Sequence, residues 1–213
     1  MATVLTIVYA LLVAAHLASC AVDARTLHLV TKPLLMPALL ALCLASGRDV
    51  PVSVILALVL ATIGDAALLS SKKMWFIVGG LSFLACHLAY SWTFAADIDL
   101  ARLPPPVWLA VAVYLGAGLA LYRAVRANLG QMGPPTIAYL AVLGVMSFCA
   151  LARFVCVGST PALVVFLGSV LFLASDYLLI FNANKRPIRH ADLFVMATYI
   201  AAQTMIVVGY LAG

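Results

Sequence analysis

Long apolar runs, separated by short polar breaks, dominate this chain. A helix that crosses a bilayer needs about 20 mainly apolar residues, and the pattern predicts eight such helices with proline or charge at the breaks. The run over residues 54–60 does not alternate polar and apolar positions as a barrel strand would. The sequence therefore predicts an all-α, polytopic membrane protein that forms one integral membrane domain over residues 1–213. The predicted helices cover residues 3–22, 33–46, 51–70, 74–94, 105–123, 134–152, 161–182 and 191–211.

Composition narrows the class further. Hydrophobic residues make up 66% of the 213 residues and charged residues only 9%, whereas soluble domains contain about 25% charged residues. This excludes a water-soluble enzyme, because so few charges cannot cover a solvated surface. It also excludes a disordered chain, which would be poor in apolar residues.

Lysine and arginine are distributed unevenly among the breaks. Those after the first, third, fifth and seventh predicted helices hold nine of the twelve basic residues, and Arg48, Arg102 and Arg153 lie in the others. Loops rich in Lys and Arg stay in the cytoplasm, so we expect both termini on the non-cytoplasmic side. Such residues can also bind lipid phosphates. The composition favours a bacterial inner membrane. The nine residues are Arg25, Lys32, Lys72, Lys73, Arg123, Arg126, Lys185, Arg186 and Arg189.

The first apolar run ends in a motif that resembles a lipoprotein cleavage box, Leu17 to Cys20. Residues 1–20 contain no Lys or Arg, which a signal peptide would carry. We therefore expect a retained helix. All five cysteines lie in or near apolar runs, where cysteine behaves as a small hydrophobic residue. They are Cys20, Cys43, Cys86, Cys149 and Cys156.

Two acids stand inside apolar runs. Asp65 follows Gly64 in the third predicted helix, and Asp176 follows Ser175 in the seventh. Their similar surroundings, four helices apart, suggest two parallel four-helix halves. Asp65 lies about 10 Å along its helix from the basic loop that follows, and Asp176 lies about 13 Å from the basic loop that follows its own helix. A charged residue at the centre of a membrane helix costs about 2.5–3.5 kcal/mol, so two acids at matched depth point to function, although a buried Asp can also stabilise neighbouring helices.

Other polar residues fall at similar depth. His87 and Tyr90 share a face of the fourth predicted helix, because residues three apart are neighbours on a helix. Each polar group could also form only an interhelical hydrogen bond. Together they indicate a cavity that opens toward the cytoplasm. The further candidates for binding or orienting substrate are Lys32, Ser175, Asn182, Tyr199 and Gln203.

A metal centre is the weaker interpretation. Zinc enzymes use three protein ligands, and His87 could complete a set with the two aspartates. Of the other histidines, we place His28 and His190 in loops and His16 in the outer half of the first helix. We therefore expect neither a metal nor a cofactor, and no nucleic-acid partner.

Taken in order, several short motifs resemble those of the YhhN family of membrane proteins. They are Lys32-Pro33, Gly64-Asp65, Phe83 with His87 and Tyr90, Ser175-Asp176, and Tyr199 with Gln203. The resemblance implies a lysoplasmalogenase, which hydrolyses the vinyl ether bond of a lysophospholipid to a fatty aldehyde and glycerophosphoethanolamine or glycerophosphocholine. The resemblance also implies that membrane lipids surround the protein. The substrate could be a related lysolipid instead of lysoplasmalogen.

The chemistry of this reaction fits two buried acids. Protonation of the vinyl ether carbon creates an oxocarbenium ion, a problem that glycosidases solve with two carboxyl groups. If Asp65 and Asp176 face each other, one would act as acid and the other as base. A proton-coupled transporter would use the same pair, although no helix has a Gly or Pro break at its middle. A scaffold protein would not need these acids.

Overall fold

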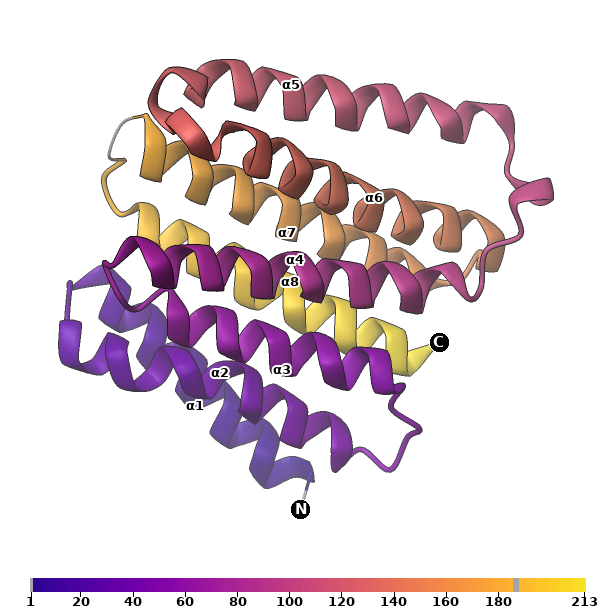
Figure 1. Ribbon diagram of the computed structural model, residues 1–213. Coiled ribbons are helices and arrows are strands. Elements are labelled where there is room, and N and C mark those ends of the chain that lie inside the picture. The colour runs from indigo at the N-terminus through magenta and orange to yellow at the C-terminus, as the bar shows by residue number, and fades with distance from the viewer. Residues whose placement is uncertain (1, 186–187) are drawn as a thin grey trace. The chain divides into compact units, whose positions relative to one another are not determined.

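The computed structural model describes residues 2–185 and 188–213, and within these ranges it contains helices and no strands (Figure 1). Three short 3₁₀ segments, Leu100–Arg102, Pro105–Trp108 and Gly130–Met132, flank α5. The predicted all-α class is confirmed. The α-helices are α1 (Ala2–Ala21), α2 (Arg25–Leu44), α3 (Val52–Ala67), α4 (Lys73–Ala95), α5 (Leu109–Leu129), α6 (Gly133–Val157), α7 (Thr160–Asn184) and α8 (Ala191–Ala212).

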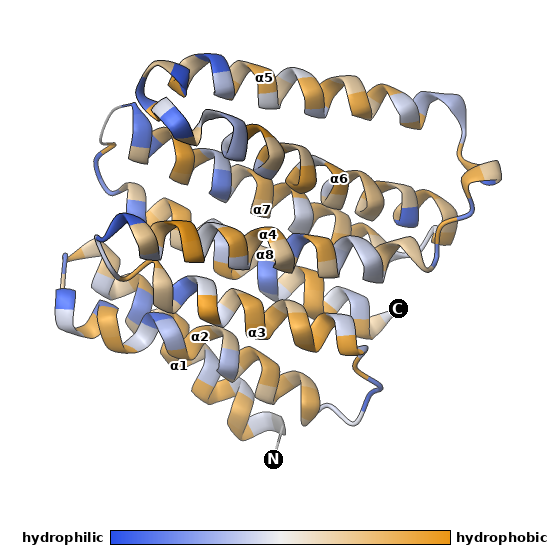
Figure 2. Ribbon diagram, in the orientation of Figure 1, coloured by the Kyte–Doolittle hydropathy of each residue, from blue (hydrophilic) through white to orange (hydrophobic). Residues whose placement is uncertain are grey.

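Six helical stretches in the described ranges are long and apolar enough to cross a membrane. The pair α5 and α6 lies within one of them, Pro105–Val157, and α3 is a shorter apolar helix of 16 residues. Large apolar side chains also point outward: Val113 and Leu115 on α5 are each 66% exposed. Figure 2 shows apolar residues along most of the helix lengths. The chain is an integral, multi-pass membrane protein, and the count of eight crossings stays a prediction.

The chain divides into two compact units, the first ending at Thr93 and the second beginning at Phe94. In the first unit α1 packs against α2, and α2 packs against α3. Helix α4 contacts α3 at Gly64, where an added Cβ would lie 2.7 Å from the Phe83 ring. A larger residue at position 64 would therefore displace the Phe83 ring or the helix that carries it.

In the second unit α7 and α8 form the most extensive helix pair. Gly168 of α7 lies so close to α8 that an added Cβ would stand 3.0 Å from the backbone at Ala202 and Ile206. Small residues allow this approach in membrane proteins, where close packing stabilises helix pairs. A separate apolar cluster joins α5 and α6, and Tyr177 and Phe181 of α7 pack against it.

Helix α2 begins eight residues before the predicted start at residue 33, which corrects that boundary. Pro33 and Pro37 both lie inside α2, so the expectation that no helix has a proline at its middle, which spoke against a transporter, is wrong. We expected proline at a helix start, where its missing N–H costs least, but membrane helices tolerate internal proline because neighbouring groups satisfy the freed carbonyls. The turn before α2 uses a left-handed backbone at Asp23, with φ of 53°.

Helix α6 continues to Val157, beyond the predicted end at residue 152. Gly158 then ends it in the left-handed region, with φ of 67°, a conformation that glycine adopts without steric cost. Arg153 therefore lies within a helix and is buried, whereas the sequence placed it in a loop. Arg186, counted for the predicted orientation, lies outside the described residues.

Candidate functional site

Asp65 lies in the last turn of α3 and is almost fully buried, with 1% of its surface exposed. Gly64 directly before it contacts the Phe83 ring of α4. The absence of a side chain at position 64 brings the backbone that carries Asp65 close to α4. Burial of this acid inside the protein is what a catalytic or proton-transfer role requires.

His87 and Tyr90, the two polar residues predicted to share a face of α4, are both fully buried in the structure. The backbone carbonyl of His87 accepts a hydrogen bond from the Ser91 hydroxyl at 2.8 Å. Lys32 is half-buried within α2, and not in the break before a helix that starts at residue 33, as predicted. Of the candidates predicted from the sequence, the first unit thus holds a buried acid, a buried imidazole, a buried phenol and a partly exposed amine.

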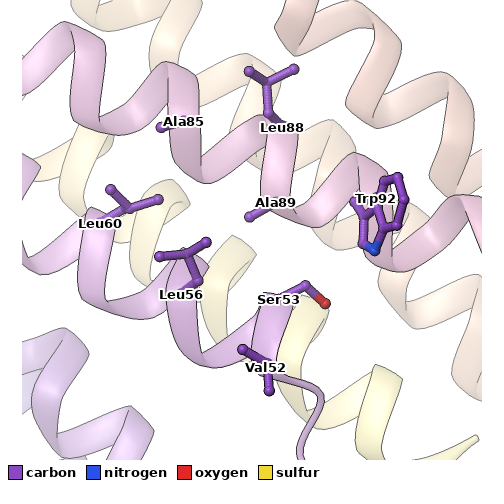
Figure 3. Close-up of a pocket in the computed structure, with 8 residues that line it drawn as sticks. All are labelled: Val52, Ser53, Leu56, Leu60, Ala85, Leu88, Ala89 and Trp92. Atoms are coloured by element: carbon purple, nitrogen blue, oxygen red, sulfur yellow. The ribbon is translucent and has the colours of Figure 1, made fainter.

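A largely apolar groove of about 580 Å³ runs between α3 and α4 (Figure 3). Leu60 and Ala85 lie toward one end of the groove, and Val52 and Trp92 toward the other. Leu60 precedes Asp65 by five residues, about 7.5 Å along the helix. The groove is therefore nearest to the acid at its Leu60 end. Its lining consists of Val52, Ser53, Leu56, Leu60, Ala85, Leu88, Ala89 and Trp92.

Asp176, on α7 in the second unit, is 5% exposed. The Tyr139 hydroxyl on α6 donates a hydrogen bond to its Oδ2 at 2.5 Å. This bond fixes the orientation of the carboxyl group. Sequence reasoning missed Tyr139, although a phenol in the middle of an apolar run was a signal that a polar partner lay nearby.

The remaining candidates of the second unit serve partly to join elements. The Ser175 hydroxyl donates to the Val195 carbonyl of α8 at 2.9 Å, which ties α7 to α8. The Asn182 side-chain oxygen accepts the Ile188 N–H at 2.8 Å. Both residues therefore have structural roles in addition to any contact with substrate.

Tyr199 and Gln203 are buried on α8, with 4% and 0% of their surfaces exposed. The Tyr199 ring meets the Phe172 ring of α7 edge-on, with centroids 5.5 Å apart. The second unit thus buries an acid, a phenol and an amide on α7 and α8, and Tyr139 on α6 is half-buried. Asp65 belongs to the first unit and Asp176 to the second, so the facing of the two carboxyl groups stays a prediction.

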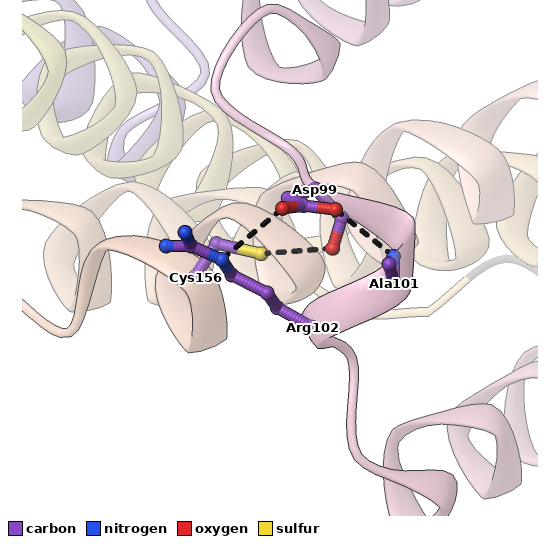
Figure 4. Close-up of polar contacts among 4 residues, drawn as sticks. All are labelled: Asp99, Ala101, Arg102 and Cys156. Atoms are coloured by element: carbon purple, nitrogen blue, oxygen red, sulfur yellow. Dashed lines mark hydrogen bonds and ion pairs between the residues drawn. The ribbon is translucent and has the colours of Figure 1, made fainter.

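Polar contacts also hold the segment between α4 and α5. The Asp99 carboxylate accepts a hydrogen bond from the Ala101 N–H at 3.0 Å and forms an ion pair with Arg102 at 3.1 Å (Figure 4). The backbone carbonyl of Asp99 accepts a hydrogen bond from the Cys156 thiol. Asp99 and Arg102 are largely exposed. These contacts shape a loop and offer no buried site for chemistry.

A second interaction of this loop is partly buried. Arg153 Nε donates to Asp97 Oδ2 at 2.7 Å, and the guanidinium lies over the Tyr210 ring, 4.8 Å from its centroid. The Arg153 side chain is only 5% exposed.

Among the described residues, one group of three could hold a metal ion, His16, Cys20 and His28 in the first unit.

These features define the class: an all-helical, multi-pass membrane protein with buried carboxylic acids on two of its helices. The chain belongs to the YhhN family, whose sequence profile matches residues 27–210. It is 36% identical over 155 residues to the pig (Sus scrofa) protein named lysoplasmalogenase TMEM86B, and 30% identical over 150 residues to the human (Homo sapiens) protein of that name. Each alignment covers 70% of this chain and 59% of the relative.

A bovine (Bos taurus) relative, named lysoplasmalogenase TMEM86A, is 28% identical over 153 residues, covering 70% of this chain and 61% of that protein. The chain thus matches about 60% of the length of these relatives. No solved structure matches it.

Proposed function

We propose that this protein hydrolyses the vinyl ether bond of lysoplasmalogen, or of a related lysolipid, within the membrane. The observation that carries the proposal is the family membership together with 28–36% identity to proteins named lysoplasmalogenases. The buried Asp65 and Asp176 support it, because an acid-catalysed hydrolysis needs carboxyl groups shielded from bulk water.

The reaction divides into two proton transfers. One aspartic acid donates a proton to the β-carbon of the vinyl ether, which leaves an oxocarbenium ion at the carbon bonded to oxygen. The other aspartate accepts a proton from water as its oxygen attacks that carbon. The hemiacetal then collapses: its hydroxyl loses a proton, the bond to the glycerol oxygen breaks, and that oxygen takes up a proton. The products are a fatty aldehyde and a glycerophospho alcohol.

Other polar groups would orient the reactants. Tyr139 donates to Asp176 and holds that carboxyl in one orientation. We assign His87 and Tyr90 to positioning of water or substrate, on the basis of their complete burial on α4. Lys32 would contact the substrate phosphate, because it is partly exposed and carries an ammonium group. We extend the positioning role to Ser175, Asn182, Tyr199 and Gln203.

The groove between α3 and α4 would hold the hydrocarbon chain of the substrate. Its lining is almost entirely apolar, and its Leu60 end lies nearest to Asp65. With the ether group at Asp65, the chain would run toward Trp92. Ala89→Trp, which places a large ring in the groove, should lower kcat/KM for long-chain substrates more than for short-chain ones. An equal loss for both chain lengths would contradict this placement.

We further propose eight membrane crossings, two parallel four-helix halves, and both termini on the non-cytoplasmic face of a bacterial inner membrane. The uneven distribution of basic residues supports this orientation. A reporter fused after Gly213 should be active only outside the cytoplasm.

The deciding experiment measures aldehyde release by mass spectrometry from purified protein and lysoplasmalogen. Asp65→Asn and Asp176→Asn should each lower the rate by about 10²–10⁴-fold, because Asn keeps the shape and loses the proton. Asp49→Asn, at an exposed loop position, is the matched control and should retain activity. The wild-type rate should fall on both sides of a pH optimum, since one acid must be protonated and the other ionised.

Two outcomes would overturn the proposal. If wild-type protein releases no aldehyde but transports a solute into liposomes, and both Asn variants abolish that flux, the protein is a transporter. If both Asn variants hydrolyse the lipid at the wild-type rate, the two acids do not catalyse the reaction. His87→Gln should reduce the rate less than either Asn variant if His87 only orients.

A further inference from the structure

Three potential metal ligands meet where α1 ends and α2 begins. His16 and Cys20 lie one turn apart on α1, and His28 lies in the first turn of α2. Cys20 Sγ is 3.7 Å from His16 Nε2 and 3.6 Å from His28 Nδ1, and the ligand atoms of all three residues lie within 4.8 Å of one another. His16 and Cys20 are buried and His28 is half-buried.

The two sulfur-to-nitrogen separations match those around a bound zinc ion. Zinc binds cysteine sulfur at about 2.3 Å and histidine nitrogen at about 2.0–2.1 Å. At tetrahedral or trigonal angles, these bond lengths require a sulfur-to-nitrogen separation of about 3.6–3.8 Å. Both observed sulfur-to-nitrogen separations fall in that range. Two nitrogens bound to one zinc would lie about 3.3–3.6 Å apart, and the ligand atoms as a set lie within 4.8 Å, so the two imidazoles would move closer together around the ion.

A neighbouring hydrogen bond sets the tautomer of His16. Its Nδ1 lies 2.8 Å from Thr31 Oγ1, and the Thr31 hydroxyl donates its own proton to the Leu27 carbonyl at 2.7 Å. Thr31 Oγ1 must therefore accept a proton from His16 Nδ1, which leaves the Nε2 lone pair directed toward Cys20. Metal-binding histidines in proteins are oriented in this way, by a hydrogen bond from the nitrogen that does not bind the metal.

Without metal, the same groups form a chain of hydrogen bonds. The Cys20 thiol would donate to His16 Nε2, and its sulfur would accept from His28 Nδ1. Metal binding would release the thiol proton, because the thiolate is the ligand, and would move the ring proton of His28 to Nε2. This exchange needs no oxidant or reductant.

We propose that His16, Cys20 and His28 bind one thiophilic transition-metal ion of the Zn²⁺ type, which joins the end of α1 to the start of α2. One thiolate and two imidazoles favour such an ion over the hard cations Mg²⁺ and Ca²⁺. Two of the ligands precede residue 27, where the match to the family begins. The site is independent of the proposed hydrolysis.

The test uses the full-length protein in detergent, stripped of metal, with Zn²⁺ added against a chromophoric competitor. Wild-type protein should bind one Zn²⁺ per chain at micromolar or lower concentration, and Co²⁺ should give a thiolate charge-transfer band. Zn²⁺ should also raise the midpoint of thermal unfolding, because a ligand that binds only the folded state stabilises it. Thr31→Val should weaken Zn²⁺ binding about 10–100-fold, as expected for loss of a partner that orients a ligand.

Cys20→Ser and His28→Gln should each abolish the Co²⁺ band and micromolar Zn²⁺ binding. Cys43→Ser, which changes another buried cysteine of the first unit, is the matched control and should bind like wild type. If Cys20→Ser fails to fold, the half-buried His28→Gln gives the same answer. Binding only at millimolar Zn²⁺, equal binding of Mg²⁺, or a Co²⁺ band that survives in His28→Gln would overturn the proposal.

Discussion

Loss of the Asp97 charge should destabilise the protein more than loss of its partner Arg153. The Arg153 side chain is 5% exposed and that of Asp97 39%. Asp97→Asn therefore leaves a buried cation without its counter-ion, whereas Arg153→Met leaves a carboxylate that water can reach. Within the described part of the chain, Arg153 Nη1 has no hydrogen-bond partner, so removal of the guanidinium also relieves an unfavourable burial.

The size of the effect follows from the 2.7 Å contact between Nε and Oδ2. Two unit charges at this separation attract by about 6 kcal/mol at an effective dielectric constant of 20 and by about 1.5 kcal/mol in water. Because Asp97 is more than one-third exposed, its interaction lies between these limits. We expect Asp97→Asn to lower the free energy of unfolding by about 2–4 kcal/mol, near the lower end of the range for broken buried pairs.

Reversible unfolding in mixed detergent micelles, followed by circular dichroism, gives the free energy of unfolding for each variant. The series comprises wild type, Asp97→Asn, Arg153→Met and the double variant, which together form a double-mutant cycle. Arg153→Met should cost about 1–2 kcal/mol, mainly through the lost contact with the Tyr210 ring. The double variant should be close to Arg153→Met alone.

Two results would refute this reasoning. A loss below about 0.5 kcal/mol for Asp97→Asn would mean that water or lipid headgroups screen the ion pair, as at an exposed site. A larger loss for Arg153→Met than for Asp97→Asn would mean that packing of the arginine, and not its charge, stabilises the second unit.

Three further predictions concern single contacts. Tyr139→Phe should lower kcat for aldehyde release about 2–10-fold, from the roughly 0.5–1.5 kcal/mol of a hydrogen bond, and an unchanged kcat would remove Tyr139 from the site. Gly64→Ala should lower the free energy of unfolding by about 1–3 kcal/mol, because the new Cβ would lie 2.7 Å from the Phe83 ring. Adding Phe83→Leu should restore part of the loss. If Gly64→Ala leaves the free energy of unfolding unchanged, the two helices are not closely packed at this point. Ser175→Ala should lower that free energy by about 0.5–1.5 kcal/mol, since its hydroxyl donates to a backbone carbonyl. It should also raise KM in a steady-state assay, and an unchanged KM would limit Ser175 to joining α7 and α8.

The helices could largely be predicted from the sequence, because charge and proline mark most of their ends. The starts of α4, α6, α7 and α8 lie within one residue of prediction. The start of α2 could not be predicted, since a proline at a helix start and a proline inside a membrane helix give the same local pattern. This error also misplaced His28, which was assigned to a loop and lies in a helix.

The neighbours of His16 could not be predicted for a related reason. It lies five residues before the end of α1, within 2.8 Å of Thr31 on α2, and which side of the membrane that end faces stays a prediction. The residue type alone shows that burying an imidazole in a membrane costs free energy. The residue that hydrogen-bonds to it depends on which helix packs beside it. The same limit explains why Asp65 and Asp176 could be predicted to be buried, while Tyr139 could not be paired with Asp176.

The two prolines inside α2 have a mechanical consequence. Each proline lacks the N–H that would bond to the carbonyl four residues earlier, so the carbonyls of Leu29 and Pro33 lose their helical donors. Pro33 and Pro37 lie on one side of the helix. The backbone of α2 should therefore bend most easily over these two turns. Among the helix interiors of the first unit, amide hydrogen exchange should be fastest in these turns.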